Sequence, residues 1–315
     1  MRALHVPGIG EHERLSDVPV PAVLPGTVLV RVHAAALNAV DNVIAVGMLT
    51  SRWPRAYPVI LGRDAAGVVA AVGPGVRGIA VGDEVFGSVP LTPPIQAGTL
   101  AEYALMPADS VAAKPAGMDF VTAAAIPFAG TVATAAVAAV DLRAGETVLV
   151  TGASGGVGSF AVQLAAARGA TVIATGAADS TERLRRLGAA IVVDHTAGPV
   201  AAQVRAVRPE GVDALIDLVA YTAGTLPLDA VAPGGRVACT GGANDELTMT
   251  WHGLIGREIV PDTSGALIGR LADQVAAGAL SVDVTEVLSL DQATDGLRTI
   301  AQGHARGKIV ISLAG

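Results

Sequence analysis

The sequence contains a single cysteine, Cys239, among its 315 residues. One cysteine excludes an intramolecular disulfide and any zinc site built from several cysteines, and it suits a reducing compartment. We expect Cys239 to be a small buried residue in a strand. Aromatic residues make up only 3% of the chain, so a pocket lined by aromatic side chains cannot be predicted from it.

Basic charge is also scarce. The net charge is -7 and the isoelectric point is about 5.3, so no basic surface is expected to bind nucleic acid. The first residues contain charges and no apolar core, which argues against a signal peptide. Residues 120–140 are uncharged and long enough to cross a bilayer, but alanine, threonine, glycine and Pro127 favour a buried helix. We therefore expect a soluble cytoplasmic protein without a membrane partner.

One stretch combines a strand, a glycine-rich turn and a helix. Residues 147–151 are β-branched or apolar, which is typical of a buried strand. The turn at 152–158 has the pattern Ala-x-Gly-x-x-Gly, a dinucleotide-binding motif with alanine for its first glycine. A helix over 157–168 and a strand over 171–175 complete a β-α-β unit.

Small residues in such a turn let the backbone approach a pyrophosphate, while free N–H groups at the helix start bind the anion. We therefore assign cofactor binding to this set: Ser154, Gly155, Gly156, Val157 and Gly158.

The first third of the chain differs in pattern from the part that follows. Residues 1–113 contain short apolar segments interrupted by proline and glycine, which predicts a mainly antiparallel β domain. We expect strands over 2–6, 27–35, 67–72, 84–88 and 101–106, and a helix over 39–45.

From residue 114 onward, helices and strands alternate, which predicts a doubly wound parallel sheet with right-handed crossovers. The further helices are expected over 121–126, 131–140, 181–187, 199–207 and 222–232, and the further strands over 190–193, 212–218, 236–240 and 258–261. The tail is expected to rejoin the first domain, with helices over 266–277 and 290–301 and strands over 284–289 and 308–312. The predicted fold is α/β, with one domain formed by 1–113 and 262–315 and another by 114–261.

Several motifs occur in a characteristic order. They are Asn38-Ala39-Val40-Asp41, residues 61–69, 81–87, 98–103 and 145–158, and Gly307-Lys308-Ile309-Val310. Together they resemble the medium-chain dehydrogenase/reductase superfamily, in its zinc-free quinone oxidoreductase branch, over nearly the whole chain. The resemblance implies a GroES-like catalytic domain, a Rossmann domain, a cofactor cleft between them and a homodimer formed through the Rossmann sheet edge.

Zinc-dependent members of the superfamily carry a cysteine in the first motif and a His-Glu pair in the second. Residues 38–41 and the pair Arg63-Asp64 hold those places here, so no metal site is expected. His33 is expected to be structural. Val43 and Val132 depart from the tyrosine and threonine common in relatives, which leaves the substrate open.

Two residues are candidates for catalysis. The resemblance places Asn38 beside the nicotinamide, where its amide N–H₂ would be a donor for a carbonyl oxygen. Tyr57 is a second candidate donor, although packing on Trp53 explains it equally well. Asp41 is expected to be a structural hydrogen-bond acceptor, and Arg63 and Asp64 are explained by pairing with each other.

The cofactor choice depends on the end of the strand over 171–175. An NAD site needs an acidic residue there, and none occurs before Asp179, which forms an Asp-x-x-Glu capping pattern with Glu182. NADP is therefore favoured, with its 2′-phosphate bound by Thr175, Ser180 and Arg183. Val219, Gly241 and Lys308 complete the predicted cofactor-binding set.

The predicted function is NADPH-dependent hydride transfer to a quinone or an α,β-unsaturated carbonyl compound, without a metal. One alternative is an NADP-dependent alcohol dehydrogenase or carbonyl reductase, although alkoxide formation would lack a Lewis acid. The other is a regulatory protein that binds NADPH without turnover.

Overall fold

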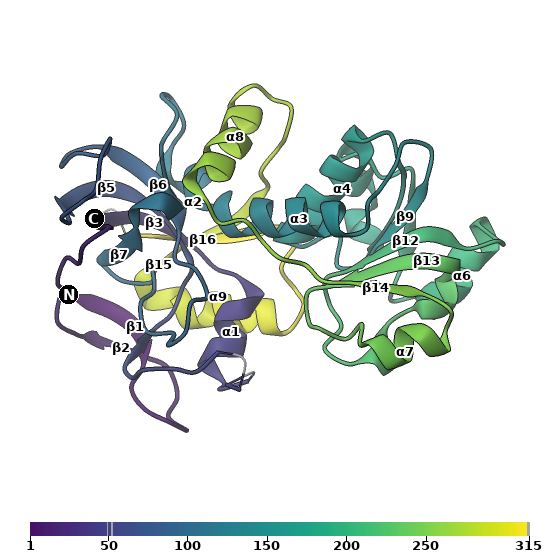
Figure 1. Cartoon of the computed structure of the whole chain (residues 1–315), viewed down its shortest axis with the longest axis horizontal. Coiled ribbons are helices and arrows are strands. Elements are labelled where there is room, and N and C mark those ends of the chain that lie inside the picture. Colours follow the sequence, from purple (N-terminus) through teal and green to yellow (C-terminus); the bar gives the residue numbers. More distant parts are fainter. Residues whose placement is uncertain (49, 52, 314–315) are drawn as a thin grey trace. The chain divides into compact units, whose positions relative to one another are not determined.

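The computed structural model describes residues 1–48, 50–51 and 53–313. The chain divides into two compact units, one formed by Met1–Phe128 with Thr263–Gly315 and the other by Ala129–Asp262. The second division lies one residue from the limit expected after residue 261, whereas the first follows Phe128 rather than residue 113. Figure 1 shows the course of the chain and the labels of its elements.

Unit 1 is built around the long strand β3 (Thr27–Ala36), which pairs with β5, β7 and β16. Its larger sheet has the order β15-β16-β3-β5-β6-β8, with β7 also on β3, and only the pair of β15 and β16 is parallel. A smaller antiparallel sheet has the order β2-β1-β4. The other strands of the unit are β1 (Arg2–Val6), β2 (Arg14–Asp17), β4 (Val59–Ile60), β5 (Asp64–Val72), β6 (Glu84–Ser88), β7 (Tyr103–Pro107), β8 (Val111–Ala113), β15 (Val284–Ser289) and β16 (Lys308–Ser312).

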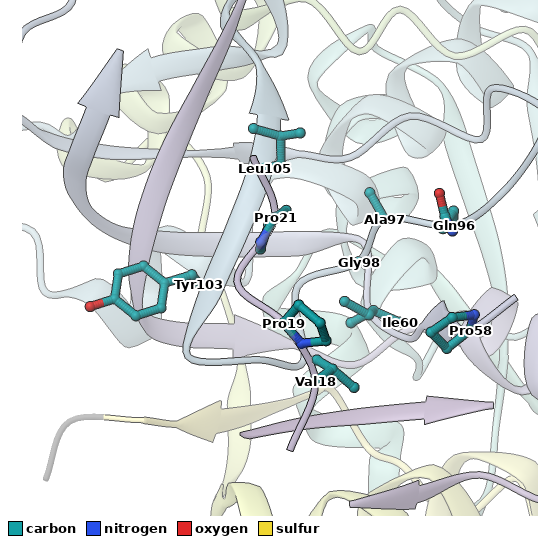
Figure 2. A pocket seen from close by; sticks show the side chains of 10 residues that line it. All are labelled: Val18, Pro19, Pro21, Pro58, Ile60, Gln96, Ala97, Gly98, Tyr103 and Leu105. Carbon is teal, nitrogen blue, oxygen red and sulfur yellow. The ribbon is translucent and has the colours of Figure 1, made fainter. Parts of the chain in front are cut away.

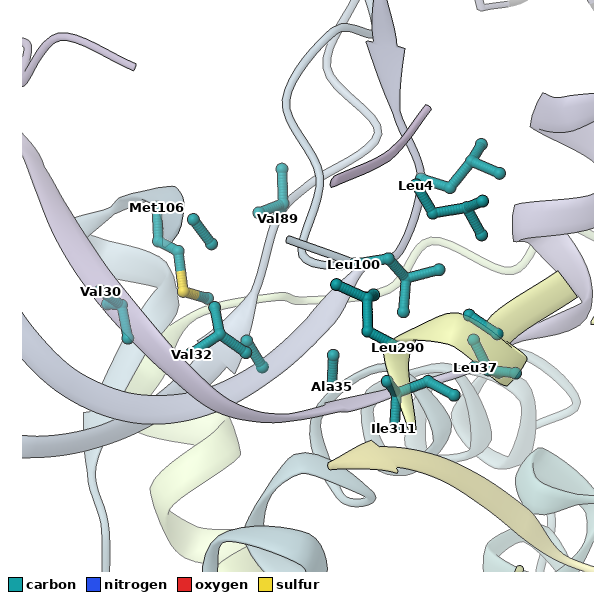
Figure 3. Close-up of a cluster of buried hydrophobic side chains, with 14 of the residues drawn as sticks. Leu4, Val30, Val32, Ala35, Leu37, Val89, Leu100, Met106, Leu290 and Ile311 are labelled. Atoms are coloured by element: carbon teal, nitrogen blue, oxygen red, sulfur yellow. The ribbon is translucent and has the colours of Figure 1, made fainter. Parts of the chain in front are cut away.

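Apolar side chains from both sheets and from the C-terminal segment form the core of unit 1. Figure 3 shows Val30, Val32 and Met106 in this core together with Leu290 and Ile311 from the end of the chain. The helices of the unit are α1 (Ala39–Ala45), α2 (Phe120–Ala124), α8 (Gly265–Ala276) and α9 (Ala293–Ala301), with short 3₁₀ turns at Ala108–Ser110 and Leu290–Gln292. The predicted antiparallel β domain is confirmed.

Unit 2 contains a six-stranded parallel sheet with the order β11-β10-β9-β12-β13-β14. The strand β9 (Thr147–Val150) lies inside the sheet and is buried along its whole length, as expected of a strand covered on both faces. The other strands are β10 (Thr171–Gly176), β11 (Ile191–Asp194), β12 (Val212–Asp217), β13 (Val231–Cys239) and β14 (Ile255–Arg257). The helices are α4 (Gly156–Ala167), α5 (Thr181–Arg186), α6 (Val200–Val207) and α7 (Glu246–Trp251). The predicted doubly wound sheet is confirmed, and Cys239 is buried in β13 as expected.

The uncharged segment over 120–140 forms two helices, α2 and α3 (Pro127–Ala139), rather than one. Most of their side chains are buried inside the protein. No helix among the described residues is long and apolar enough to cross a membrane.

Candidate cofactor and active site

The strand order of unit 2 reverses between β9 and β12, because the chain moves outward from β9 through β10 and β11 and then returns to β12. In open parallel sheets, ligands bind outside the carboxyl ends of the strands at such a point. The glycine-rich turn follows β9 directly and leads into α4, so the fold places the predicted motif at this switch point.

Gly155 and Gly158 lack side chains for different reasons. A Cβ on Gly158 would lie 2.2 Å from the Gly152 oxygen and 2.5 Å from the Ala153 Cα, so close packing of α4 on the turn excludes it. A Cβ on Gly155 would meet only the Gly152 oxygen, at 3.4 Å, and the φ of -80° suits any residue. The protein leaves open space at Gly155, which is where the motif requires close approach of a ligand.

The start of α4 provides donors for an anion. Gly155 is the N-cap, and its N–H donates to the Gly152 oxygen, while the Ser159 N–H returns to the Gly155 oxygen. Helix geometry leaves the N–H groups of Gly156, Val157 and Gly158 without intrahelical partners. With the positive end of the helix dipole, these groups fit a pyrophosphate.

Neighbouring segments hold the turn in place. The Gly152 N–H donates to Oγ1 of Thr175 at 3.1 Å, which links the turn to the end of β10. Nη2 of Arg183, on α5, donates to the Ser154 oxygen at 2.6 Å. Thr175 and Arg183 therefore lie beside the glycine turn, where the sequence placed them.

The predicted contact of Ser180 with a phosphate has a competing interaction. Ser180 is buried, and its hydroxyl donates to the carboxylate of Asp179 at 3.1 Å. The predicted capping role of Asp179 is wrong, because Ser180 is the N-cap of α5 and Asp179 lies one residue earlier. As expected, β10 and the two residues after it contain no acidic side chain.

Asp217 lies at the end of β12, the strand next to β9 at the switch point, and holds the segment that follows β12. It was not predicted from the sequence. Its carboxylate accepts the Thr151 hydroxyl at 2.5 Å and the backbone N–H groups of Val219 and Ala220 at 3.0 and 2.6 Å. A Cβ on Gly152 would lie 2.9 Å from Cγ2 of Val219, so Val219 borders the glycine turn.

Gly241 is required by packing. A Cβ at this position would lie 2.0 Å from the Ala220 oxygen, in the segment that follows β12. Gly241 is therefore close to the same sheet edge, and its missing side chain has a reason independent of a ligand.

Asn38 is the centre of a buried polar cluster in unit 1. Its Nδ2 donates to Oδ2 of Asp64 at 3.0 Å and to the Ala36 oxygen at 3.3 Å, and its Oδ1 accepts from Nζ of Lys308 at 2.6 Å. The Asn38 backbone N–H donates to Oδ2 of Asp41 at 2.8 Å, which begins α1. The structural role expected of Asp41 is confirmed, and both N–H bonds of the Asn38 amide are directed at protein atoms.

Four charged side chains in this cluster are buried, namely Asp41, Arg63, Asp64 and Lys308. Burial raises the pKa of Asp41 to about 6, although the positive charges of Arg63 and Lys308 oppose the rise. Burial likewise raises the pKa of Asp64 and lowers the pKa of Lys308.

The expected pairing of Arg63 with Asp64 is wrong. Nη2 of Arg63 instead donates to the backbone oxygens of Ile60 and Ala97, at 3.2 and 2.6 Å. The carboxylate of Asp64 accepts from Asn38 and from the Phe128 N–H at 2.9 Å, and lies 3.8 Å from Nζ of Lys308.

Tyr57 is half-buried and packs, like Trp53, against the core of unit 1. Unit 1 also has a pocket of about 260 Å³ beside the neighbouring residue Pro58. Figure 2 shows its mostly apolar lining, to which Ile60 and Leu105 contribute together with Gln96. No predicted site residue lines this pocket.

Within residues 1–48, 50–51 and 53–313, no group of three or more histidine, cysteine or acidic side chains could hold a metal ion. His33 stacks on the ring of Phe120 with 4.6 Å between the centroids, which agrees with its expected structural role.

Comparisons with known proteins agree with this architecture. Residues 24–116 match the family "Alcohol dehydrogenase GroES-like domain", and residues 187–311 match "Zinc-binding dehydrogenase". The chain is 33% identical to 2-methylene-furan-3-one reductase of Solanum lycopersicum, over 94% of this chain and 74% of the relative. It is 31% identical to the chloroplast envelope quinone oxidoreductase homolog of Arabidopsis thaliana, over 94% and 92% of the two chains. A mycobacterial protein solved in complex with NADPH superposes with a TM-score of 0.86 at 27% identity, over 99% of this chain and 100% of that one.

Proposed function

This chain belongs to the medium-chain dehydrogenase/reductase superfamily, in its quinone oxidoreductase branch, and from that premise we propose that it uses NADPH to reduce quinones or α,β-unsaturated carbonyl compounds without a metal. The observation that carries the proposal is the open space at Gly155. A Cβ there would contact only the Gly152 oxygen, at 3.4 Å, and the space lies beside the N–H donors at the start of α4. The relatives named as a furanone reductase and a quinone oxidoreductase homolog support the substrate class.

Unit 2 supplies the residues for cofactor binding. The N–H groups of Gly156, Val157 and Gly158 bind the pyrophosphate, while Val219 borders the turn. Arg183, beside the turn, supplies charge for a 2′-phosphate, and the missing acid after β10 removes the usual partner of an NAD ribose. When bound, NADPH supplies a hydride.

Substrate reduction places negative charge on the carbonyl oxygen, which requires donors nearby. Asn38 and Tyr57 are the predicted residues from unit 1, and Tyr57 remains the candidate donor. Because both N–H bonds of the Asn38 amide reach Asp64 and Ala36, Asn38 organises the site through these contacts. The proton that completes an enolate is supplied by solvent.

The donor set does not suit zinc. The places of the cysteine and histidine ligands of zinc-dependent relatives hold Asn38 and Arg63, and the buried guanidinium of Arg63 is itself a cation. An alcohol dehydrogenase activity would therefore have no Lewis acid for alkoxide formation.

Steady-state oxidation of NADPH with a panel of quinones and enones tests the proposal, and metal analysis of the same preparation tests the absence of zinc. We expect turnover with at least one quinone or enone and much less than one zinc per chain. Turnover only in the alcohol-oxidising direction with NADP⁺ would support the dehydrogenase alternative. NADPH binding without any turnover would support a regulatory protein.

A further inference from the structure

The side-chain amide of Asn38 lies between two buried groups of opposite charge. Nζ of Lys308 is 2.6 Å from its oxygen, and Oδ2 of Asp64 is 3.0 Å from its nitrogen. Lys308 is the first residue of β16, Asp64 is the first residue of β5, and Asn38 directly precedes α1. Three segments that are distant in the sequence therefore meet at one amide.

This arrangement permits one orientation of the amide. A rotation by 180° about the Cβ–Cγ axis would turn the NH₂ group toward the ammonium of Lys308 and the oxygen toward the carboxylate of Asp64. Both contacts would be repulsive, and they would occur at a buried site, where electrostatic interactions are stronger than in water. The charges on Lys308 and Asp64 thus set the orientation of Asn38.

Lys308 also contacts the backbone next to Asn38, because its Nζ donates to the Leu37 oxygen at 2.9 Å. The Asn38 backbone N–H in turn holds Asp41 in the first turn of α1. The carboxylates of Asp64 and Asp41 are the charged groups that act on the ammonium of Lys308. The same two carboxylates act on the second buried cation, Arg63, so the cluster contains two positive and two negative groups. Removing the charge of Lys308 alone would leave an excess of buried negative charge.

We propose that Lys308 is a positioning residue of the candidate active site, which fixes the amide orientation of Asn38 and the start of α1 rather than contacting the cofactor. The link to catalysis rests on the proposed function, since Asn38 is assigned to the active site only there. Burial lowers the pKa of Lys308, and the nearby carboxylates of Asp64 and Asp41 oppose that effect and favour the ammonium form.

The composition of the chain makes the amide directly observable. The sequence contains only three asparagines, Asn38, Asn42 and Asn244, and only two lysines, Lys114 and Lys308. Selective ¹⁵N labelling of asparagine therefore gives three side-chain NH₂ signals, of which that of Asn244, in unit 2, is the internal control and that of Asn42 reports on α1. Lys114 is a matched control lysine, because it is also nearly buried in unit 1 and pairs with a carboxylate, Glu84, at 3.0 Å.

In the full-length protein, Lys308→Met should move the Asn38 NH₂ signal and leave that of Asn244 in place, and Lys308→Arg should restore it in part. The Asn42 signal should move less than that of Asn38, because Asn42 lies one turn further along α1 and its amide donates to the Leu297 oxygen. Lys114→Met should move none of the three. If Lys308→Met does not fold, the double variant Asp64→Ser with Lys308→Met removes both charges without adding an asparagine and still tests whether the Asn38 signal depends on them. An unchanged Asn38 signal in a folded variant without Lys308 would overturn the proposal.

Kinetics separate positioning from cofactor binding. For Lys308→Met we expect kcat/KM with 2-cyclohexen-1-one to fall by about 10- to 100-fold, because small misplacements in an active site are costly. The Kd of NADPH should remain within about threefold of wild type, a loss below 1 kcal/mol. A large rise in that Kd without a change in the Asn38 signal would instead make Lys308 a cofactor-binding residue. If the wild-type protein reduces neither quinones nor enones, the proposed function fails, and the NMR comparison still decides the positioning role.

Discussion

At Gly155 the protein itself leaves room for a side chain, whereas at Gly158 it does not. Gly155→Val should therefore abolish NADPH binding, because the new side chain fills the space that the pyrophosphate needs. Its cost in folding stability should not exceed about 1 kcal/mol, the penalty for valine at a helix N-cap. Gly158→Ala should instead destabilise unit 2 by roughly 1–3 kcal/mol, because its Cβ would contact backbone atoms.

Fluorescence titration with NADPH and thermal denaturation of both variants check this contrast. If Gly155→Val binds NADPH with the wild-type Kd, the glycine turn is not the cofactor site. If Gly158→Ala is as stable as wild type, α4 does not pack closely enough on the turn to exclude a Cβ at this position.

Asp41 should make folding stability depend on pH. Its pKa is raised from 3.8 to about 6 in the folded protein, so the folded state binds a proton more tightly than the unfolded state. Stability from this group is therefore fully present below pH 4 and is lost as the pH rises through about 6. The difference corresponds to about 3 kcal/mol at most.

Asp41→Asn keeps an oxygen for the Asn38 N–H and removes the titration. Urea denaturation of wild type and Asp41→Asn at several pH values between 4 and 8 should show a smaller loss of stability with rising pH in the variant. The exposed carboxylate of Asp17 is the control, and Asp17→Asn should follow the wild-type curve. Equal slopes for Asp41→Asn and wild type would contradict the raised pKa.

The same cluster shows what sequence spacing could not predict. Adjacent residues of opposite charge suggested a pair between Arg63 and Asp64, but Arg63 lies in the bend before β5 and its guanidinium donates to the Ile60 and Ala97 oxygens. Asp64 instead meets Lys308, and Asn38 meets Lys308 across 270 positions of the chain. Only the folded sheet of unit 1 brings these residues together.

Arg183 connects two elements, since it belongs to α5 and donates to the Ser154 oxygen in the turn before α4. Arg183→Ala should raise the Kd of NADPH by about one to two decades, because a charge-assisted hydrogen bond to a phosphate is worth roughly 1.5–3 kcal/mol. The Kd of NADH should rise much less, because NADH has no 2′-phosphate and is affected only through the contacts that Arg183 makes within the protein.

Dissociation constants of both cofactors for wild type and Arg183→Ala decide the matter. Arg185→Ala is the control, because Arg185 is an exposed residue of the same helix. Equal increases for NADH and NADPH would mean that Arg183 supports the turn without contacting the 2′-phosphate. A wild-type preference for NADH would contradict the assignment of NADP.

Elements with strong periodicity were predicted closely, and elements with competing signals were not. The strands β1, β6, β15 and β16 and the helix α1 have the predicted limits. The predicted helix over 222–232 is wrong: the structure has 3₁₀ turns at Ala223–Thr225 and Leu228–Ala230, and β13 then begins at Val231. Gly224 and Pro227 disfavour a helix there, because glycine is costly in a helix and proline removes a backbone donor.

The segment after β13 was also mispredicted. The last strand of the parallel sheet is Ile255–Arg257 rather than 258–261, and the helix α7 before it was not predicted. Both elements are short, which leaves little periodicity to recognise. In α7, moreover, the large apolar side chains of Leu247 and Trp251 are exposed, so the apolar positions do not indicate which face of the helix is buried.

At the scale of the whole molecule, the sequence was sufficient for the fold class, because the change from short antiparallel strands to alternating strands and helices is a property of long segments. It was also sufficient for the glycine turn, which is local. It was not sufficient for Asp217, because a single carboxylate after an apolar strand has no distinctive spacing. The buried contact of Asp217 with Thr151 depends on strands that are adjacent in the sheet and separated in the sequence.

The edge strand of the parallel sheet, β14, lies beside exposed apolar side chains of α7. Among the described residues, the strand β14 has a strand neighbour on one side only. Leu247 and Trp251 lie four residues apart on α7 and are 81% and 87% exposed, and Ile255 on β14 is 40% exposed. An edge strand beside exposed apolar side chains is suited to pair with its own copy about a twofold axis. We therefore propose a homodimer formed through β14 and α7.

Trp251→Glu should weaken such a dimer strongly. A large buried apolar side chain contributes about 1.5–3 kcal/mol, and a twofold interface contains it twice, so the dimer Kd should rise by roughly two to four decades. Ile9→Glu is the control, because Ile9 is also 87% exposed but lies in unit 1. Sedimentation velocity over a range of protein concentrations should give dimers for wild type and Ile9→Glu and monomers for Trp251→Glu. A wild-type protein that stays monomeric at the highest concentration, or a Trp251→Glu variant that stays dimeric, would show that this edge is not the interface.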